Sequence, residues 1–245
     1  MARAAQKRFT VVKSRRIYVQ IAEQITALIR SDEWKPGERL PAERDLSLQL
    51  GVGRPAVREA LIWLEATGLI QVKPGDGAFV RSHVAPQSAD QEGDLGPGPL
   101  EQIEARLLIE PQVAALAAKN CRMEDVEDLA VLLEQMRNLD SRGDDVGGVR
   151  YRFHTKLAEM SGNSFLAATV KQLWDLRARE MWRTLRSWRA RPASSETGKP
   201  LSTTSALHAT EQIVQALRNR DPEGARWAME TMIRGVQHIY FDREV

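Results

Sequence analysis

Residues 41–63 constrain the fold more than any other stretch, because their pattern is that of a helix, a tight turn and a second helix. Leu46 and Leu50 lie four residues apart, on one face of the first helix. We expect Gly51 to end this helix, since glycine adopts the left-handed conformation without a Cβ penalty. Pro55 then stands in the first turn of a new helix, where its missing N–H costs little. The stretch therefore predicts a helix-turn-helix.

The second helix of this unit has an apolar face and a cationic face. Val57, Leu61 and Leu64 recur at the spacing of an inner stripe. Arg54 and Arg58 lie four residues apart on another face, near the start of the helix. In a helix-turn-helix the second helix enters the major groove of DNA, so cations at its start favour nucleic-acid binding.

A small β-hairpin is predicted directly after this helix. Residues 69–72 alternate like a short strand, 73–77 have the composition of a turn, and 78–80 return as a second strand. An amphipathic helix predicted at 17–31 supplies the third side of the unit. The whole is a winged helix-turn-helix.

These segments resemble the GntR family of bacterial transcription regulators. The matching runs are residues 35–46, 51–61, 64–70 and 75–80. The resemblance implies sequence-specific binding to double-stranded DNA. It places Arg44, Arg54 and Arg58 at DNA-contacting positions and Gly75 at the tip of the wing. Lys73 stands where the family usually has an arginine, and it joins the DNA-binding residues that we expect.

Positive charge is concentrated in the same part of the chain. The formal charge of the 245 residues is +2, with 13 Lys or Arg against 9 Asp or Glu in residues 1–80 and 22 against 24 in the rest. A basic excess beside the helix-turn-helix suits binding to phosphates. Residues 1–16 are basic without helical periodicity; they are either an arm that touches DNA or a solvated tail.

Composition also indicates where the chain acts. Cys121 is the only cysteine, which excludes an internal disulfide and fits a reducing compartment. The sequence has no apolar run typical of a signal peptide or a membrane span, so we expect a cytoplasmic protein without a membrane partner. It also lacks a Gly-rich phosphate loop and a Gly-x-Ser-x-Gly elbow. We therefore expect neither an enzyme nor a bound cofactor.

Two domains and a linker are predicted. Residues 82–99 are rich in Pro, Gly, Ser and acids, and we interpret them as a linker between residues 17–81 and residues 100–245. Helical periodicity runs through the second domain, so the fold class is mainly α, with a bundle of six or seven helices. Pro111 should kink its helix or open a new segment. Residues 164–189 should form one long helix.

The second domain resembles the effector domain of the FadR-type branch of the GntR family, the FCD domain. The matching runs are residues 106–111, 153–163 and 216–225. This resemblance implies a helical bundle with an internal ligand cavity. Within the branch, residues 172–182 are most similar to repressors of hexuronate and related sugar-acid catabolism.

A metal site known from many FadR-type domains is incomplete in this sequence. Those domains resemble one another in an Asp placed four residues before the His of a Phe-His pair, and in two further His on the last two helices. Here His154 is present, but the other three positions hold Arg150, Thr210 and Met232. One imidazole beside an arginine does not suit Zn²⁺ or Ni²⁺, so we expect no metal.

A carboxylate effector is the hypothesis that fits these replacements. Arg150 would take over the positive charge of the metal and, with Arg106 and His154, bind an acidic effector directly, because guanidinium pairs with carboxylate in a bidentate fork. Further hydrogen bonds to hydroxyl groups would come from Asn163, Arg177 and Thr210. The alternative interpretation makes Arg150 a surface residue and His154 a satisfied core histidine.

The sequence as a whole predicts a ligand-responsive transcription repressor. We expect a homodimer that binds a palindromic operator, since a two-fold protein matches a two-fold site. The effector is a small carboxylate, with a hexuronate or related sugar acid as the candidate. A metal-dependent or fatty-acyl-responsive regulator of the same branch is the alternative.

Overall fold

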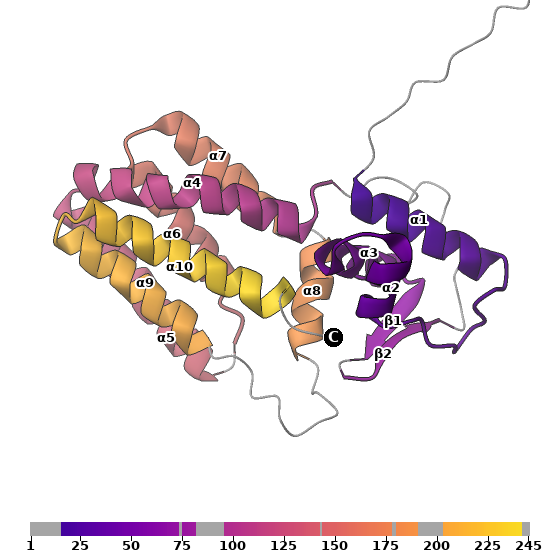
Figure 1. Cartoon of the computed structure of the whole chain (residues 1–245). Coiled ribbons are helices and arrows are strands. Elements are labelled where there is room, and N and C mark those ends of the chain that lie inside the picture. Colours follow the sequence, from indigo (N-terminus) through magenta and orange to yellow (C-terminus); the bar gives the residue numbers. More distant parts are fainter. Residues whose placement is uncertain are drawn as a thin grey trace, which may run out of the picture.

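The computed structural model describes residues 16–73, 75–81, 96–142, 144–177, 180–190 and 203–241 (Figure 1). A winged helix-turn-helix is followed by an all-α bundle, so the expected fold class is confirmed. The basic arm, apart from Arg16, and residues 82–95 of the expected linker lie outside the described residues. None of the helices in these ranges combines the length and the apolar character that a membrane span requires.

The first part of the fold holds three helices and a hairpin. Local signals set its turns: Gly51 has φ 65° and ψ 32°, the left-handed conformation expected of a glycine that ends a helix. The hairpin is antiparallel, with Ile70 opposite Val80, and an isolated bridge joins Arg39 to Phe79. The elements are α1 (Ile17–Arg30), α2 (Glu43–Leu50), α3 (Arg54–Ala66), β1 (Ile70–Lys73) and β2 (Gly77–Val80).

The second part of the fold contains seven helices within the described residues. Helix α10 lies along both α4 and α9, and α5, α6 and α7 complete the bundle (Figure 1). Their bounds are α4 (Pro99–Asn120), α5 (Met123–Arg142), α6 (Gly147–Met160), α7 (Ser164–Leu176), α8 (Glu180–Ala190), α9 (Thr203–Arg218) and α10 (Pro222–Phe241).

One expectation about helix breaks was wrong, and one of the two alternatives for Pro111 is excluded. Residues 164–189 do not form one long helix, because α7 ends at Leu176 and α8 begins at Glu180. Conversely, Pro111 opens no new segment, and α4 continues through it. A proline inside a helix removes one backbone hydrogen bond and costs about 3 kcal/mol. Pro111 is buried, so the packing of α4 is the term that offsets this cost.

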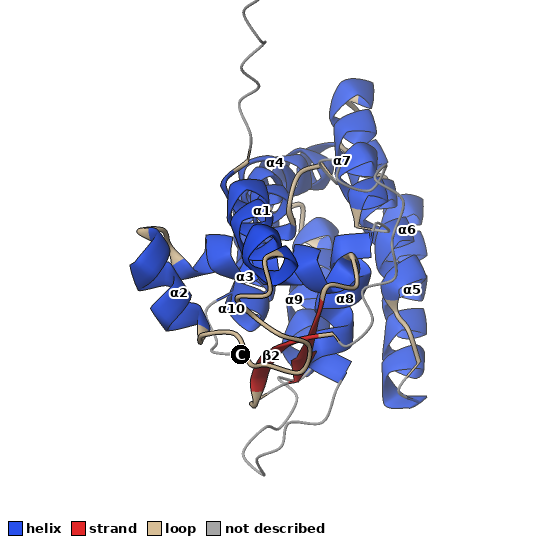
Figure 2. Ribbon diagram, turned by 90° about the vertical axis from the view of Figure 1, so that its right-hand side faces the viewer, coloured by secondary structure: helices blue, strands red, loops and turns tan. Residues whose placement is uncertain are grey.

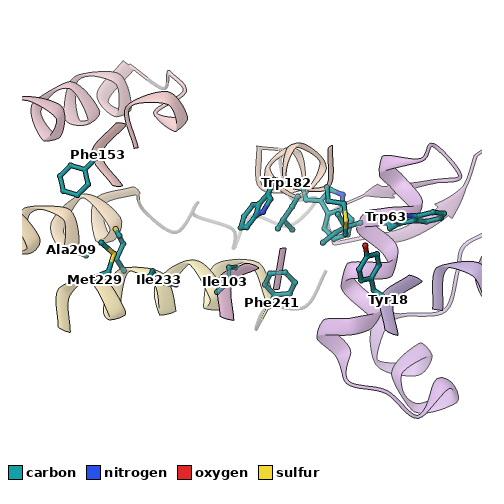
Figure 3. Close-up of a cluster of buried hydrophobic side chains, with 14 of the residues drawn as sticks. Tyr18, Trp63, Ile103, Phe153, Trp182, Ala209, Met229, Ile233 and Phe241 are labelled. Atoms are coloured by element: carbon teal, nitrogen blue, oxygen red, sulfur yellow. The ribbon is translucent and has the colours of Figure 1, made fainter. Parts of the chain in front are cut away.

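Helix α8 joins the two parts of the fold. It lies between the bundle and α3, and Figure 2 shows the same arrangement from the side. Its buried side chains include Trp182 and Trp188. The buried apolar residues form a continuous cluster that runs from Phe153 in the bundle to Trp63 in α3 (Figure 3). The winged part therefore packs against the bundle through these buried apolar side chains, which we call the apolar joint.

A buried carboxylate links α3 to the beginning of α4. The Oε1 atom of Glu59 accepts a hydrogen bond of 2.7 Å from the backbone N–H of Leu100. This N–H belongs to the first turn of α4, where no partner exists within the helix. A Cβ at Gly98 would come within 2.3 Å of the carboxylate, so any other residue there would displace Glu59 from this position.

The position of Glu59 affects its protonation. Burial raises the pKa of its carboxyl to about 7, and the hydrogen bond from Leu100 opposes that shift. Glu101 and Glu104 on α4 raise the pKa further, whereas Arg16 lowers it. A carboxyl whose pKa is raised on folding prefers to be protonated in the folded chain, so folding becomes less favourable as the pH rises.

We predict that Glu59→Gln makes stability less dependent on pH. In the wild type, the contribution of Glu59 to the unfolding free energy should fall between about pH 4.5 and pH 7 and stay low above that range, with a ceiling of roughly 3 kcal/mol. The variant should therefore gain stability relative to wild type at pH 8, as measured by urea unfolding. Glu159→Gln, at an exposed glutamate of α6, is the control. Parallel pH profiles for Glu59→Gln and wild type would contradict the prediction.

Candidate DNA-binding surface and ligand site

Four of the five residues expected to bind DNA are accessible in the winged part. The Arg44 side chain is 76 % exposed, and Arg54 opens α3 in a half-buried position. Lys73 is exposed, with its Nζ atom 4.5 Å from the centre of the Phe79 ring. Gly75 lies in the hairpin turn with φ 77°, which suits glycine. These positions can contact DNA without a change in the fold.

Arg58 differs from the expectation. Its side chain is only 3 % exposed, and two guanidinium nitrogens donate to the carboxylate of Glu43 at 2.8 and 2.9 Å. The Nη1 atom donates to the backbone carbonyl of Tyr240, in the last turn of α10, at 2.8 Å. In this conformation Arg58 is therefore directed into the protein and cannot reach DNA. The sequence pattern placed it four residues from Arg54 but contained no signal for its partners.

A charged cluster lies inside the bundle around Arg106 and Glu110 of α4. The Arg106 side chain is 1 % exposed, and its Nε atom donates to Glu110 Oε1 at 2.5 Å. Its Nη2 atom is 3.4 Å from Glu110 Oε2. The Nη1 atom is buried and has no hydrogen-bond partner among the described residues. A buried, unpaired donor is unfavourable, so a ligand that accepts from it would be stabilised.

His154 and Trp174 complete the surroundings of Glu110. The Nδ1 atom of His154 is 2.6 Å from Glu110 Oε2, and the indole N–H of Trp174 donates to Glu110 Oε1 at 3.2 Å. The His154 and Trp174 rings lie with centroids 4.2 Å apart. Arg106 lies 4.6 Å from the centre of the Trp174 ring. The carboxylate thus orients a cation, an imidazole and an indole at one place.

Two more arginines add positive charge. Arg177 lies 4.7 Å from the Trp174 ring centre and 4.4 Å from that of Trp182. Burial lowers its pKa, and nearby Arg106 and Arg150 lower it further. Arg106 and Arg177 therefore share one carboxylate, Glu110, among the described residues. The surplus of positive charge favours an anionic ligand.

The protonation of the Glu110–His154 pair follows from these neighbours. Burial alone would raise the pKa of Glu110, but Arg106 and His154 together lower it below its usual range. Burial lowers the pKa of His154 to about 4, although Glu110 opposes this shift. Glu110 is therefore ionised and His154 neutral near pH 7. With Nδ1 donating its proton to Glu110, the Nε2 atom of His154 is left as an acceptor.

Asn163 and Thr210 do not join this cluster. The Asn163 side chain caps the start of α7, where Oδ1 accepts from the N–H groups of Phe165 and Leu166 at 3.1 Å each. The Oδ1 atom of Asn163 is therefore engaged by its own helix. Thr210 is buried on α9 and donates to the carbonyl of Ala206 at 2.7 Å. Both side chains are thus engaged within or beside their own helices.

Two of the four positions that align with metal ligands in FadR-type domains lie close together in this structure. Thr210 Oγ1 and Met232 Sδ are 3.7 Å apart, so the two residues aligned with missing histidines do face each other. Across the described ranges, no group of three or more His, Cys, Asp or Glu side chains could hold a metal ion. Neither a threonine nor a thioether replaces an imidazole as a ligand for Zn²⁺. The residues present do not fit a metal of that kind.

A groove of about 480 Å³ lies elsewhere, between α5 and α9. Its charged side chains pair with one another: Arg137 with Glu211 at 2.9 Å, and Arg218 with Glu127 at 3.1 Å. These pairs leave no charge surplus of the kind found around Arg106. The groove is therefore a weaker candidate for a carboxylate site than the buried cluster, despite its volume.

Sequence patterns missed the central residue of the cluster. Glu110 follows Arg106 by four residues, a spacing that brings the two side chains together on a helix. That signal was available, but the same spacing also occurs in exposed pairs such as Glu230 and Arg234. The two pairs differ in burial. The burial of Glu110 comes from α6 and α7, which place His154 and Trp174 against it.

Comparisons with known proteins agree with this architecture. Residues 17–80 match the model of the bacterial regulatory proteins of the gntR family, and residues 101–235 match the FCD domain. The chain is 31 % identical to the Uxu operon transcriptional regulator of Escherichia coli K12, over 95 % of this chain and 94 % of that protein. It is 30 % identical to the Exu regulon transcriptional regulator of the same strain, over 95 % and 87 %. It is 32 % identical to the HTH-type transcriptional repressor NanR of Klebsiella aerogenes, over 88 % and 82 %.

We predict that Glu110→Gln destabilises the fold strongly. The substitution leaves Arg106 buried without its carboxylate, and breaking a buried pair in this way costs about 3–5 kcal/mol. Glu230→Gln is the matched control, since Glu230 and Arg234 form a pair at the same spacing on the exposed side of α10. It should cost less than about 1 kcal/mol. Chemical denaturation measures both; equal losses would mean that the cluster is not a buried ionic network.

Proposed function

This chain belongs to the gntR family of bacterial regulatory proteins and carries an FCD domain, and we propose that it is a transcription repressor controlled by a small carboxylate. The family consists of transcription regulators rather than enzymes. The observation that carries the effector part of the proposal is the buried Arg106, whose Nη1 atom has no partner among the described residues.

On the DNA side, we propose a homodimer that binds a palindromic operator. Two winged helix-turn-helix units related by a two-fold axis match two half-sites of opposite direction. Arg44, Arg54, Lys73 and Gly75 would make the contacts, since all four are exposed or half-exposed. Residues 17–81 would form the DNA-binding domain and residues 100–245 the effector and dimerisation domain. Action on DNA in a bacterium implies a cytoplasmic location.

On the effector side, the cluster favours a hydroxylated carboxylate. Arg106 and Arg177 offer donors for the carboxylate, and Arg150 adds positive charge nearby. The Nε2 atom of His154 would accept a hydrogen bond from a hydroxyl group, because Nδ1 is directed to Glu110. A hexuronate has both groups. The likeness of residues 172–182 to hexuronate repressors, and the relatives named for the Uxu operon and the Exu regulon, support this choice.

The alternatives within the same branch fit less well. A metal-dependent regulator would need imidazoles where this chain has Thr210 and Met232. A fatty-acyl effector would bring a long apolar chain to a cluster with three arginines, a glutamate and a histidine, and desolvating those groups against hydrocarbon is costly. Neither alternative uses the unpaired donor of Arg106.

We predict that Arg54→Ala weakens operator binding by roughly ten- to hundredfold. The operator is first selected from a random DNA library with the purified protein, and fluorescence anisotropy then gives the affinity at several salt concentrations. Loss of a phosphate contact should also flatten the salt dependence. Arg142→Ala, which removes the same charge from the exposed end of α5, should bind like wild type. If the two variants bind equally well, Arg54 makes no DNA contact.

We predict that glucuronate or galacturonate raises the melting temperature, whereas glucose and galactose do not. A ligand that binds only the folded state stabilises it by mass action, and the neutral sugars lack the carboxylate. Arg106→Met should abolish the effect, and Arg150→Gln should weaken affinity about tenfold in isothermal titration. Arg142→Gln is the control. A rise with divalent metals and none with either acid would overturn the proposed effector.

A further inference from the structure

Helix α3 is covered along most of its length, which is unusual for a helix that must enter a DNA groove. All of its residues from Val57 to Glu65 are buried. Helix α1 covers one side, and α8 lies on another, between α3 and the bundle (Figure 1). The first turn, which contains Arg54, is the part that stays half-exposed. The bundle therefore restricts what α3 can present to DNA.

The C-terminal end of α10 holds Arg58. The carbonyl of Tyr240 accepts from Arg58 Nη1 at 2.8 Å, and Tyr240 lies in the last turn of α10. Carbonyl groups in that turn have no partner within the helix, and the helix dipole places partial negative charge there. A guanidinium suits both features. Glu43 on α2 holds the rest of the Arg58 side chain, so the contact connects α2, α3 and α10.

Two further contacts fix α3 to the bundle. The indole N–H of Trp188 on α8 donates to the Glu65 carboxylate. The Glu59 carboxylate accepts from the N–H of Leu100 at the start of α4. Three helices of the bundle thus bind three side chains of α3, and all three side chains are charged and buried. We call this set of contacts the α3 clamp.

We propose that the α3 clamp is an autoinhibitory device, in which the bundle withholds Arg58 from DNA until the clamp opens. This inference rests on the proposed function and concerns its regulation. A clamped chain presents only Arg54 from the cationic face of α3, whereas an open chain presents Arg54 and Arg58 together. If only the open fraction binds the operator, the measured affinity is reduced in proportion to that fraction.

The effector cluster borders the clamp. Trp182 on α8 contacts Arg177, 4.4 Å from its ring centre, and also the Tyr240 ring, with centroids 5.9 Å apart. Its indole N–H donates to Gln102 of α4 at 2.7 Å. A carboxylate that draws Arg177 toward itself therefore changes the packing of α8 and of the end of α10. Such a ligand alters the clamped fraction because its affinity for the two states differs.

The first test weakens the clamp at a side chain that is neither an expected DNA contact nor an expected effector contact. Trp188→Phe removes the hydrogen bond to Glu65 and keeps Arg58 and every residue of the effector cluster. It should bind the selected operator roughly three- to tenfold more tightly than wild type without effector. Trp227→Phe is the matched control, because Trp227 on α10 is 60 % exposed. An unchanged or lower affinity of a folded Trp188→Phe protein would overturn the proposal.

The second test needs no substitution. Hydrogen exchange is followed by mass spectrometry in wild type, with and without the selected operator, at peptides covering residues 180–190 and 236–241. These segments carry the clamp but none of the expected DNA contacts, so their exchange should become faster when DNA binds. Unchanged or slower exchange contradicts the clamp. A failure to select any DNA would instead refute the proposed function, which separates the two conclusions.

Discussion

Buried carboxylates are the feature on which the arrangement of this protein depends. Glu43, Glu59, Glu65 and Glu110 are all buried, and each accepts hydrogen bonds from another part of the chain. A buried charge without partners is strongly unfavourable, so these contacts must be retained or replaced whenever the elements move. Three of the four contacts involve α3, because Glu59 and Glu65 lie on it and Glu43 binds its Arg58. The position of the winged part relative to the bundle is therefore specified by polar groups as well as by the apolar joint.

The surroundings of Glu110 differ from those of the other buried carboxylates in the ratio of positive to negative charges. Glu43 pairs with Arg58, whereas Glu110 pairs with Arg106 and also lies near Arg177. In the groove between α5 and α9 the charges pair off, so that groove has no similar excess. The Trp174 ring lies beside the imidazole of His154 and the guanidinium groups of Arg106 and Arg177.

Local sequence signals explain why much of the fold was predictable. Gly51 ends α2 in the left-handed conformation, and the hairpin follows α3 as the sequence pattern indicates. The differences from the sequence prediction concern features that are not local. Pro111 stays inside α4 because the helix is packed on both sides of it, and residues 164–189 divide because α8 packs on α3 rather than continuing α7.

By itself, the sequence determined the helix-turn-helix, the wing, the helical bundle and the family, because apolar period, glycine turns and short motifs act within a few residues. Only the tertiary structure decided what the polar side chains do. Asn163 caps a helix, Glu110 becomes the centre of a cationic cluster, and Arg58 is held by a carbonyl 182 residues away. Such contacts depend on which group of another element packs against the side chain. The periodicity of the sequence does not specify this group.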